Sequence, residues 1–243
     1  EDFIDWTEPQ FLDYGGAPPE HLYTNAAIPY FRAPHIKLGF PMRFMPDRNR
    51  LSHPVDGVSD GVFMTSRDGV RWHRWREAFI RPGLQVDRWM SRNNMTAWGI
   101  VPTESRRPDV PPNLSLYSTE NYYSDTGAVR LRRYTLRLDG FVSLHAPYEG
   151  GTLMTRPLTF SGSELEINYS TSAAGSVQVG IIEPDGELIP GFDMEDCPPM
   201  YGDSVGEVVR WKEGPDIGKL AGRSVRLRFK LKDADLYSFR FRD

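Results

Sequence analysis

Acidic side chains beside two turn signals are the first candidates for chemistry in this sequence. Asp60 forms an Asp-Gly pair with Gly61, and Glu120 lies within Tyr117–Tyr123, a run too polar for a core strand. Two carboxylates on either side of a sugar bond can act as general acid and as base or nucleophile. We therefore predict Asp60 and Glu120 as catalytic residues, although an Asp-Gly pair also serves as a simple turn.

Basic, amide and aromatic side chains stand near the same predicted strand ends. Arginine and asparagine can hold hydroxyl groups or a carboxylate, and aromatic rings can stack on sugar rings. The alternatives stay open: Arg43 could form a structural ion pair, and Asn93-Asn94 could simply make turns. The predicted ligand-binding residues are His21, Tyr23, Arg43, Arg92, Asn93, Asn94 and Tyr122.

Other chemistry finds little support in the sequence. Cys197 is the single cysteine, and its acidic neighbours disfavour a thiolate nucleophile, so we predict a structural role. His35, His53, His73 and His145 stand alone, which is typical of structural histidines. Four acidic residues lie close together in the sequence, but their spacing matches no calcium-binding loop. They are Asp193, Glu195, Asp196 and Asp203. No nucleotide-binding, serine hydrolase or metalloprotease motif occurs either, so we expect neither metal nor cofactor.

Composition excludes two classes of partner. The chain has 243 residues and a formal net charge of −4, and its pI of about 5.8 argues against nucleic-acid binding, which favours basic surfaces. No stretch approaches the roughly 20 apolar residues of a membrane helix. We therefore expect neither nucleic acid nor membrane as a partner.

The elements that must position these residues are strands. Helical periodicity is missing, and short apolar or alternating runs recur between Asp-Gly turns. In the N-terminal part these runs are 22–30, 36–44, 61–65, 71–79, 96–101, 114–117, 129–136 and 141–146. The sequence therefore predicts an all-β fold.

A turn cluster near residues 148–157 divides the chain. Beyond it, six runs fall within about 90 residues, and residues 224–232 alternate apolar and polar side chains, as in a strand with one face on a core. The six runs are 158–160, 165–169, 176–182, 207–211, 224–231 and 237–241. We predict domains at 1–149 and 150–243, the second a β-sandwich that could serve as a structural brace.

A weak repeat organises the N-terminal part. Asp2–Trp6 and Asp68–Trp72 share an Asp-to-Trp spacing, Arg137–Phe141 is a degenerate copy, and the copies lie roughly 65 residues apart. Repeats of this size are typical of propeller blades with four strands each. The runs predict two full blades and a lone outer strand at the N-terminus. A propeller needs about four blades or more, so we expect a fragment, or an oligomer in which another chain completes the propeller.

Up-and-down connectivity predicts where a site would lie. If the first strand of a blade starts at the rim of the central channel, the second ends there and the third starts there. This rule places all nine predicted catalytic and ligand-binding residues on one rim. Asp68 and Trp72, by contrast, are predicted to stabilise the turn itself.

Longer segments resemble a known family. The segments 63–75, 77–83, 132–143 and 232–237, with Ser66–Trp72 as an Asp-box-like turn, are similar to bacterial glycosyl hydrolase family 32-like and sialidase-like five-bladed propellers with a C-terminal β-sandwich. The resemblance implies a partial propeller followed by a sandwich, the C-terminal part of a longer protein, and a secreted or periplasmic location. It also implies a carbohydrate ligand.

Two functions follow as expectations. The first is a glycoside hydrolase that cleaves a polysaccharide or oligosaccharide by carboxylate acid/base catalysis. The second is a non-catalytic protein of the same architecture that binds carbohydrate through its arginine and aromatic side chains.

Overall fold

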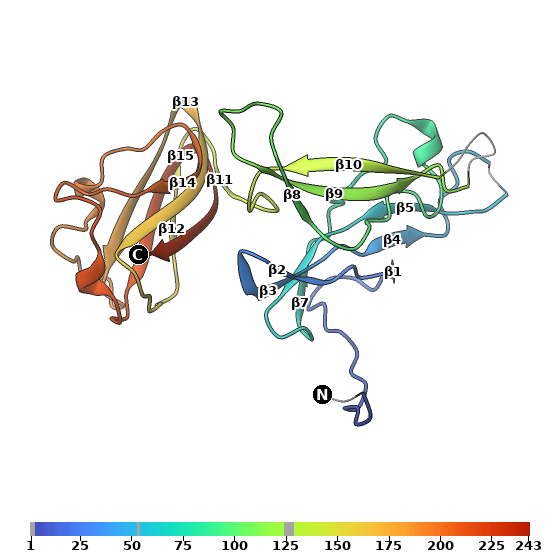
Figure 1. Cartoon of the computed structure of the whole chain (residues 1–243), viewed down its shortest axis with the longest axis horizontal. Helices are drawn as coiled ribbons and strands as arrows, with labels where there is room; N and C mark the ends of the chain where they lie inside the picture. Colours follow the sequence, from blue (N-terminus) through green and yellow to red (C-terminus); the bar gives the residue numbers. More distant parts are fainter. Residues whose placement is uncertain (1–2, 53, 124–128) are drawn as a thin grey trace. The chain divides into compact units, whose positions relative to one another are not determined.

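The structure is a computed structural model that describes residues 3–52, 54–123 and 129–243. Strands dominate the chain, as predicted, and the helical segments of the described residues are three short 3₁₀ turns (Figure 1). The chain forms two compact units, one of residues 1–103 and 113–135 and the other of residues 104–112 and 136–243. Within the described part of the chain, no helix has the length and apolar character to span a membrane.

The sequence predicted four antiparallel strands for the first blade. The structure breaks three of them in two, which gives seven shorter strands. Its sheets have the orders β2-β3-β6-β7 and β1-β4-β5. Pro41 lacks a backbone N–H and lies between β3 and β4, and Thr24 and Ala26 adopt positive φ between β1 and β2, so the ladder is interrupted at these points. The strands are β1 (His21–Tyr23), β2 (Ile28–Tyr30), β3 (Ala33–Gly39), β4 (Met42–Met45), β5 (Val58–Gly61), β6 (Met64–Ser66) and β7 (Trp72–Arg74).

The second predicted blade has three strands rather than four. β8 (Val101–Thr103), β9 (Asn113–Glu120) and β10 (Arg130–Leu136) form a sheet in the order β10-β9-β8. The predicted fourth strand contains β11 (Leu144–Ala146), which instead pairs with β15 (Arg226–Arg242) of the other unit. Residues 136–149 therefore belong to the C-terminal unit, whereas the sequence placed the boundary at 149/150. Alternation predicts a strand but does not choose its partner.

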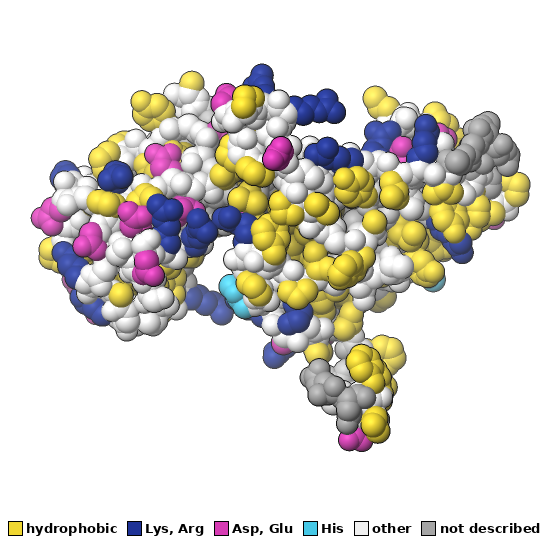
Figure 2. Space-filling view, in the orientation of Figure 1, with side chains coloured by type: hydrophobic (Ala, Val, Ile, Leu, Met, Phe, Trp, Pro, Cys, Tyr) yellow, Lys and Arg dark blue, Asp and Glu magenta, His cyan; other side chains and the backbone are white. Residues whose placement is uncertain are grey.

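The N-terminal arm does not form the predicted outer strand. Asp2 lies outside the described residues, and residues 3–12 contain no strand. Asp13 makes a single parallel bridge to Arg71 at the edge of β7. Phe3, Ile4, Trp6 and Phe11 are exposed on this arm, where Figure 2 shows a group of hydrophobic side chains.

The Asp68 turn matches its predicted structural role. Asp68 Oδ1 accepts hydrogen bonds from the backbone N–H groups of Val70 and Arg71 at 2.9 and 2.8 Å. Trp72 donates its indole N–H to the Gly69 carbonyl at 3.0 Å and is buried. These hydrogen bonds, with the backbone N–H of Arg71 contributing most, lower the pKa of Asp68.

Aromatic rings form the centre of the N-terminal unit. Phe63 stacks on Trp75 and on Phe79 with ring centroids 5.0 and 5.3 Å apart, and Phe40 lies 5.3 Å from Phe63. Phe40 and Phe63 are both buried. This cluster fixes the sheets whose edges carry the site described below.

The C-terminal unit is one five-stranded sheet built on two long strands. β13 (Glu164–Ile182) and β15 pair along their length, β11 and β12 (Gly151–Met154) pair with β15, and β14 (Asp203–Val208) pairs with β13. The sequence predicted four shorter strands where β13 and β15 each run unbroken. Register shifts after Asn168 and after Thr171 bend the pair, so the apolar faces of both ends enclose one core.

Two buried side chains of this unit, Trp211 and Cys197, form hydrogen bonds to one core residue. Trp211 donates its indole N–H to the Val179 carbonyl at 3.0 Å, and Cys197 Sγ accepts from the Val179 N–H at 3.4 Å. Burial raises the pKa of the Cys197 thiol, which fits the predicted structural role. The short 3₁₀ turns are η1 (Val86–Arg88), η2 (Met194–Asp196) and η3 (Gly218–Leu220).

Candidate functional site

An open pocket of about 370 Å³ lies between the β1–β4 pair and three loops of the N-terminal unit. Three of the predicted ligand-binding residues, His21, Tyr23 and Arg92, line it. Phe44 and Tyr123 add two further rings. The remaining described lining residues are Leu22, Met42, Val55, Asp56 and Ser91.

Strand pairing explains why rings gather on this wall. His21 is opposite Phe44 and Tyr23 is opposite Met42 in the antiparallel β1–β4 pair. Residues opposite each other project from the same face of a sheet. The His21 and Phe44 rings meet edge to face at a centroid distance of 6.4 Å, and Tyr23 is 56% exposed.

Arg92 supplies a cationic group to the pocket. Its Nη1 donates to the Tyr122 hydroxyl at 3.1 Å, and its guanidinium lies over the Tyr122 and Tyr123 rings at 5.2 and 5.6 Å. The hydrogen bond to Tyr122 raises the pKa of Arg92, so the group stays charged. Arg92 has a φ of 61°, a conformation that non-glycine residues rarely adopt.

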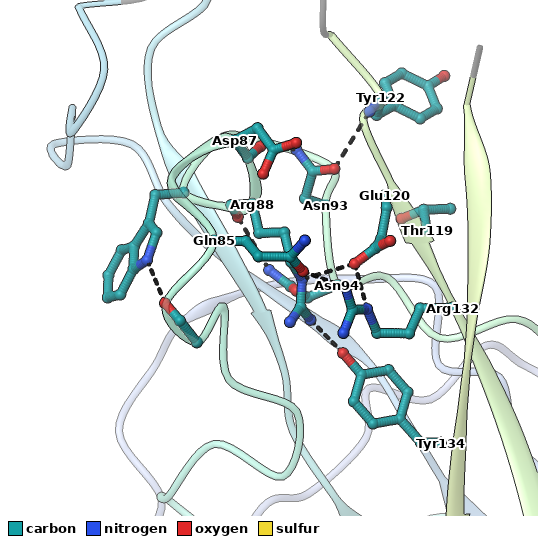
Figure 3. Close-up of polar contacts among 12 residues, drawn as sticks. Gln85, Asp87, Arg88, Asn93, Asn94, Thr119, Glu120, Tyr122, Arg132 and Tyr134 are labelled. Atoms are coloured by element: carbon teal, nitrogen blue, oxygen red, sulfur yellow. Dashed lines mark hydrogen bonds and ion pairs between the residues drawn. The ribbon is translucent and has the colours of Figure 1, made fainter. Parts of the chain in front are cut away.

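The backbone around Arg92 is held by one half-buried and two buried polar side chains. Thr119 Oγ1 donates to the Arg92 carbonyl at 2.6 Å, and Asn94 donates its side-chain N–H to the Ser59 carbonyl at 2.9 Å. Asn93 Oδ1 accepts from the Tyr122 backbone N–H at 3.2 Å (Figure 3). Asn93 and Asn94 are both 0% exposed. Their geometry therefore supports the turn alternative: these amides position the loop instead of facing the pocket.

Glu120 lies at the centre of a buried ion cluster. Its Oε1 pairs with Arg132 Nε and lies 3.3 Å from Arg88 Nε, and the residue is 6% exposed. Arg88 also hydrogen-bonds to Asn94 Oδ1 and the Tyr134 hydroxyl, as Figure 3 shows. Glu120 is not among the described residues that line the pocket. The cluster joins β9 and β10 to the loop that carries Arg92.

Asp60 and Arg43 face away from the pocket wall. Arg43 is opposite Asp60 in the β4–β5 pair and is adjacent in sequence to Met42 and Phe44, so the pleat turns it to the other face. Arg43 holds Asp60 through two hydrogen bonds of 2.9 and 2.6 Å and also pairs with Glu20 at 3.3 Å. The sequence placed these residues beside His21 and Tyr23 on one rim, and the alternation of the strands separates them.

A larger cavity of about 480 Å³ lies beside β7 and the N-terminal loop. Arg71, Arg74 and Arg76 line it. Arg71 pairs with Asp68, Arg74 pairs with Glu20, and Arg76 donates to the Gly16 carbonyl at 2.6 Å. Because two of the three guanidiniums are paired with carboxylates of the fold, this cavity offers an anionic ligand less than the Arg92 pocket does.

The acidic residues of the C-terminal unit have other partners. Asp196 pairs with Lys212 at 2.8 Å, Asp203 pairs with Arg137 at 2.6 Å, and Asp193 accepts from the Met194 N–H. Across the described residues, no three His, Cys, Asp or Glu side chains are grouped to hold a metal ion.

The polar and aromatic pocket residues that the sequence did not single out are Phe44, Asp56, Ser91 and Tyr123. Tyr123 adjoins the predicted Tyr122, and Phe44 ends a predicted strand, so both had a local signal. Asp56-Gly57 was visible as a turn. Of the lone histidines, His73 packs against Trp75 and His145 lies 3.3 Å from Asp235, whereas His53 falls outside the described residues.

Comparisons with known proteins leave the family open. No protein-family model matches the chain, and no curated protein matches it. A search of solved structures found similarity to a glycoside hydrolase family 43 arabinoxylan arabinofuranohydrolase from Bacillus subtilis, in complex with cellotetraose, at 10% identity and a TM-score of 0.26. The match covers 96% of this chain and 44% of that chain, so this chain spans less than half of its length. A likeness at this TM-score carries no argument about activity, and the family 32-like resemblance stays a prediction.

Proposed function

We propose that this protein binds carbohydrate, without cleaving it, in the Arg92 pocket. The observation that carries the proposal is the convergence of the Tyr23, Phe44 and Tyr123 rings with Arg92 around one open pocket of about 370 Å³. Pockets of roughly 300–1,000 Å³ are typical of small-molecule sites. Rings offer apolar surface to the C–H face of a sugar, and polar groups at their edge can bond its hydroxyls.

Hydrolysis has less support in this geometry than binding does. Acid/base cleavage needs two carboxylates roughly 5–9.5 Å apart around the sugar bond. Asp56 is the one carboxylate among the described residues that line the pocket. Asp60 and Glu120 instead accept hydrogen bonds from arginines in separate ion clusters. Glycoside hydrolysis therefore stays a prediction that the following experiment tests.

The test is a glycan panel assayed for both binding and turnover with the full chain. We expect several glycans to bind with no release of sugar over hours. Tyr23→Ala should abolish binding because it removes an exposed ring of the pocket wall, whereas Tyr148→Ala, a matched exposed tyrosine of the C-terminal unit, should not. Sugar release by the wild type that is lost in a folded Asp60→Asn or Glu120→Gln variant would overturn this proposal and show that the protein is a hydrolase.

A further inference from the structure

Arg92 differs from three buried or half-buried arginines of the N-terminal unit in its partners. Arg43, Arg74 and Arg88 each pair with a carboxylate. Within the described residues, Arg92 contacts one hydroxyl and two ring faces and forms no ion pair. Its positive charge is therefore not compensated by an adjacent carboxylate of the described chain.

The contacts of Arg92 leave most of its donors available. A guanidinium has five N–H donors in a planar fork. Its Nη1 donates to the Tyr122 hydroxyl, and its central carbon lies over the Tyr122 and Tyr123 rings at 5.2 and 5.6 Å, so the other N–H groups along the edge of the fork have no hydrogen-bond partner within the described residues. An edge of this kind suits a planar carboxylate, which accepts two parallel hydrogen bonds. The held backbone of Arg92, bonded to Thr119 at 2.6 Å, keeps the fork at the pocket.

Asp56 restricts which anion can bind. This carboxylate lines the same pocket, and its Oδ1 accepts a hydrogen bond from Asn49 at 2.7 Å. A carboxylate accepts hydrogen bonds from hydroxyl groups but repels a second anion. A ligand with one carboxylate and several hydroxyls can therefore satisfy Arg92 and Asp56 together, whereas a densely sulfated sugar cannot.

We propose that the Arg92 pocket selects uronic-acid residues, whose carboxylate pairs with the Arg92 guanidinium while a sugar hydroxyl donates to Asp56. This inference rests on the proposed carbohydrate-binding function and adds the ligand class. Arg92 then sets the preference for acidic over neutral sugars, and the aromatic rings supply the contacts that acidic and neutral sugars have in common.

The test uses pairs of oligosaccharides that differ in charge alone. Oligogalacturonate, glucuronoxylan oligomers and oligomannuronate are each compared with their carboxyl-reduced neutral counterparts by calorimetry on the full chain. We expect at least one acidic member to bind ten- to a hundredfold more tightly than its neutral counterpart, with a preference that weakens in high salt. A 6-sulfated oligogalactose forms a separate arm, and we expect it to bind more weakly than the uronate.

Variants at position 92 test whether Arg92 is the source of the preference for acidic sugars. Arg92→Gln should reduce the acidic-to-neutral affinity ratio to about one, because it removes the charge that acidic sugars alone require. Arg92→Lys should retain part of the ratio, because a lysine keeps the charge but not the fork. Arg67→Gln, an exposed arginine on another turn, is the control and should leave the ratio unchanged. Thermal unfolding of each variant checks that the fold is kept.

Three results separate the two proposals. Equal affinity for acidic and neutral members, or an unchanged ratio in a folded Arg92→Gln, overturns the uronate inference and leaves carbohydrate binding standing. Binding of neutral glycans alone, or tighter binding of the sulfated sugar, has the same consequence. If no glycan of either charge binds, the proposed function fails, and the uronate inference fails with it.

Discussion

Thr119 donates a 2.6 Å hydrogen bond from its side chain to the backbone carbonyl of Arg92. A residue in β9 thereby holds the loop that presents the pocket arginine. The Asn94 backbone N–H returns a 2.9 Å hydrogen bond to the Thr119 carbonyl, so the loop and the strand are joined twice. Such support lowers the entropy that the loop would lose on binding a ligand.

Thr119→Val should weaken glycan binding more than it weakens the fold. Valine keeps the shape of the side chain but loses the hydrogen bond to Arg92, so the loop has more entropy to lose on binding, and we expect affinity to fall about fivefold, which corresponds to about 1 kcal/mol. Calorimetry with the best-binding glycan measures this change. Thr103→Val, which changes a hydroxyl in β8 of the same sheet, should leave affinity within twofold. Equal affinities of the wild type and Thr119→Val would contradict the positioning role.

Asn94→Ala should destabilise the N-terminal unit by about 3 kcal/mol. The change removes two side-chain donations, to the Ser59 and Arg88 carbonyls at 2.9 and 3.2 Å, and leaves buried acceptors unpaired. It also puts alanine at a φ of 63°, which asparagine tolerates better. Urea unfolding measures the loss. Asn49→Ala, at an exposed asparagine, is the control and should change the free energy of unfolding by less than about 0.5 kcal/mol. A change as small as this for Asn94→Ala would show that the buried amide is not needed for stability.

Glu120→Gln should lower the free energy of unfolding by about 3 kcal/mol, because it leaves the buried Arg88 guanidinium without its carboxylate. Urea unfolding at neutral pH measures this effect. Glu77→Gln, at an exposed position, is the control with an expected change near zero. A Glu120→Gln protein of unchanged stability would mean that the ion cluster contributes little to the fold, and would reopen a catalytic role for this carboxylate.

Asp68→Asn should remove part of the acid sensitivity of the N-terminal unit. The pKa of Asp68 is lowered in the folded state, so the unfolded chain takes up the proton first as pH falls. Its contribution to stability is therefore fully present above the unfolded pKa of about 4 and declines progressively as pH falls from there toward the lower folded pKa. The difference in urea midpoint between wild type and Asp68→Asn should be largest at pH 7 and should narrow as pH falls below about 4. Asp47→Asn, on another exposed turn, should show no such narrowing; a difference for Asp68→Asn that is the same at pH 7 and at pH 3 would contradict the linkage.

Gly175→Ala should destabilise the bend of the C-terminal sheet by about 2 kcal/mol. An added Cβ would lie 2.4 Å from the Asp233 carbonyl oxygen, so the paired backbones of β13 and β15 would have to separate. Hydrogen exchange should speed up across residues 168–182 and 226–235. Gly151→Ala in β12 is the control, because its added Cβ would meet Ala146 at an ordinary 3.8 Å. Unchanged exchange in Gly175→Ala would mean that the bend adjusts easily.

Local sequence determined the class of fold and its turns. Period-2 alternation and Asp-Gly pairs require only neighbouring residues, so the all-β class and the Asp68 turn could be predicted from the chain alone. The strands of the first blade were also predicted, but as the unbroken runs 22–30 and 36–44, which the structure breaks at Pro41 and at the positive-φ residues Thr24 and Ala26.

Tertiary structure decided which strands pair and which faces meet. Leu144–Ala146 has the pattern of a strand in either unit, and only its pairing with β15 assigns it. His21 and Tyr23 share the pocket with Arg92, while Arg43 and Asp60 turn to the opposite face of the same sheet. The sequence named all of these residues, but a rim argument from strand ends ignores the pleat. Side-chain direction depends on register with a distant strand, and register is a non-local property that no single run of residues contains.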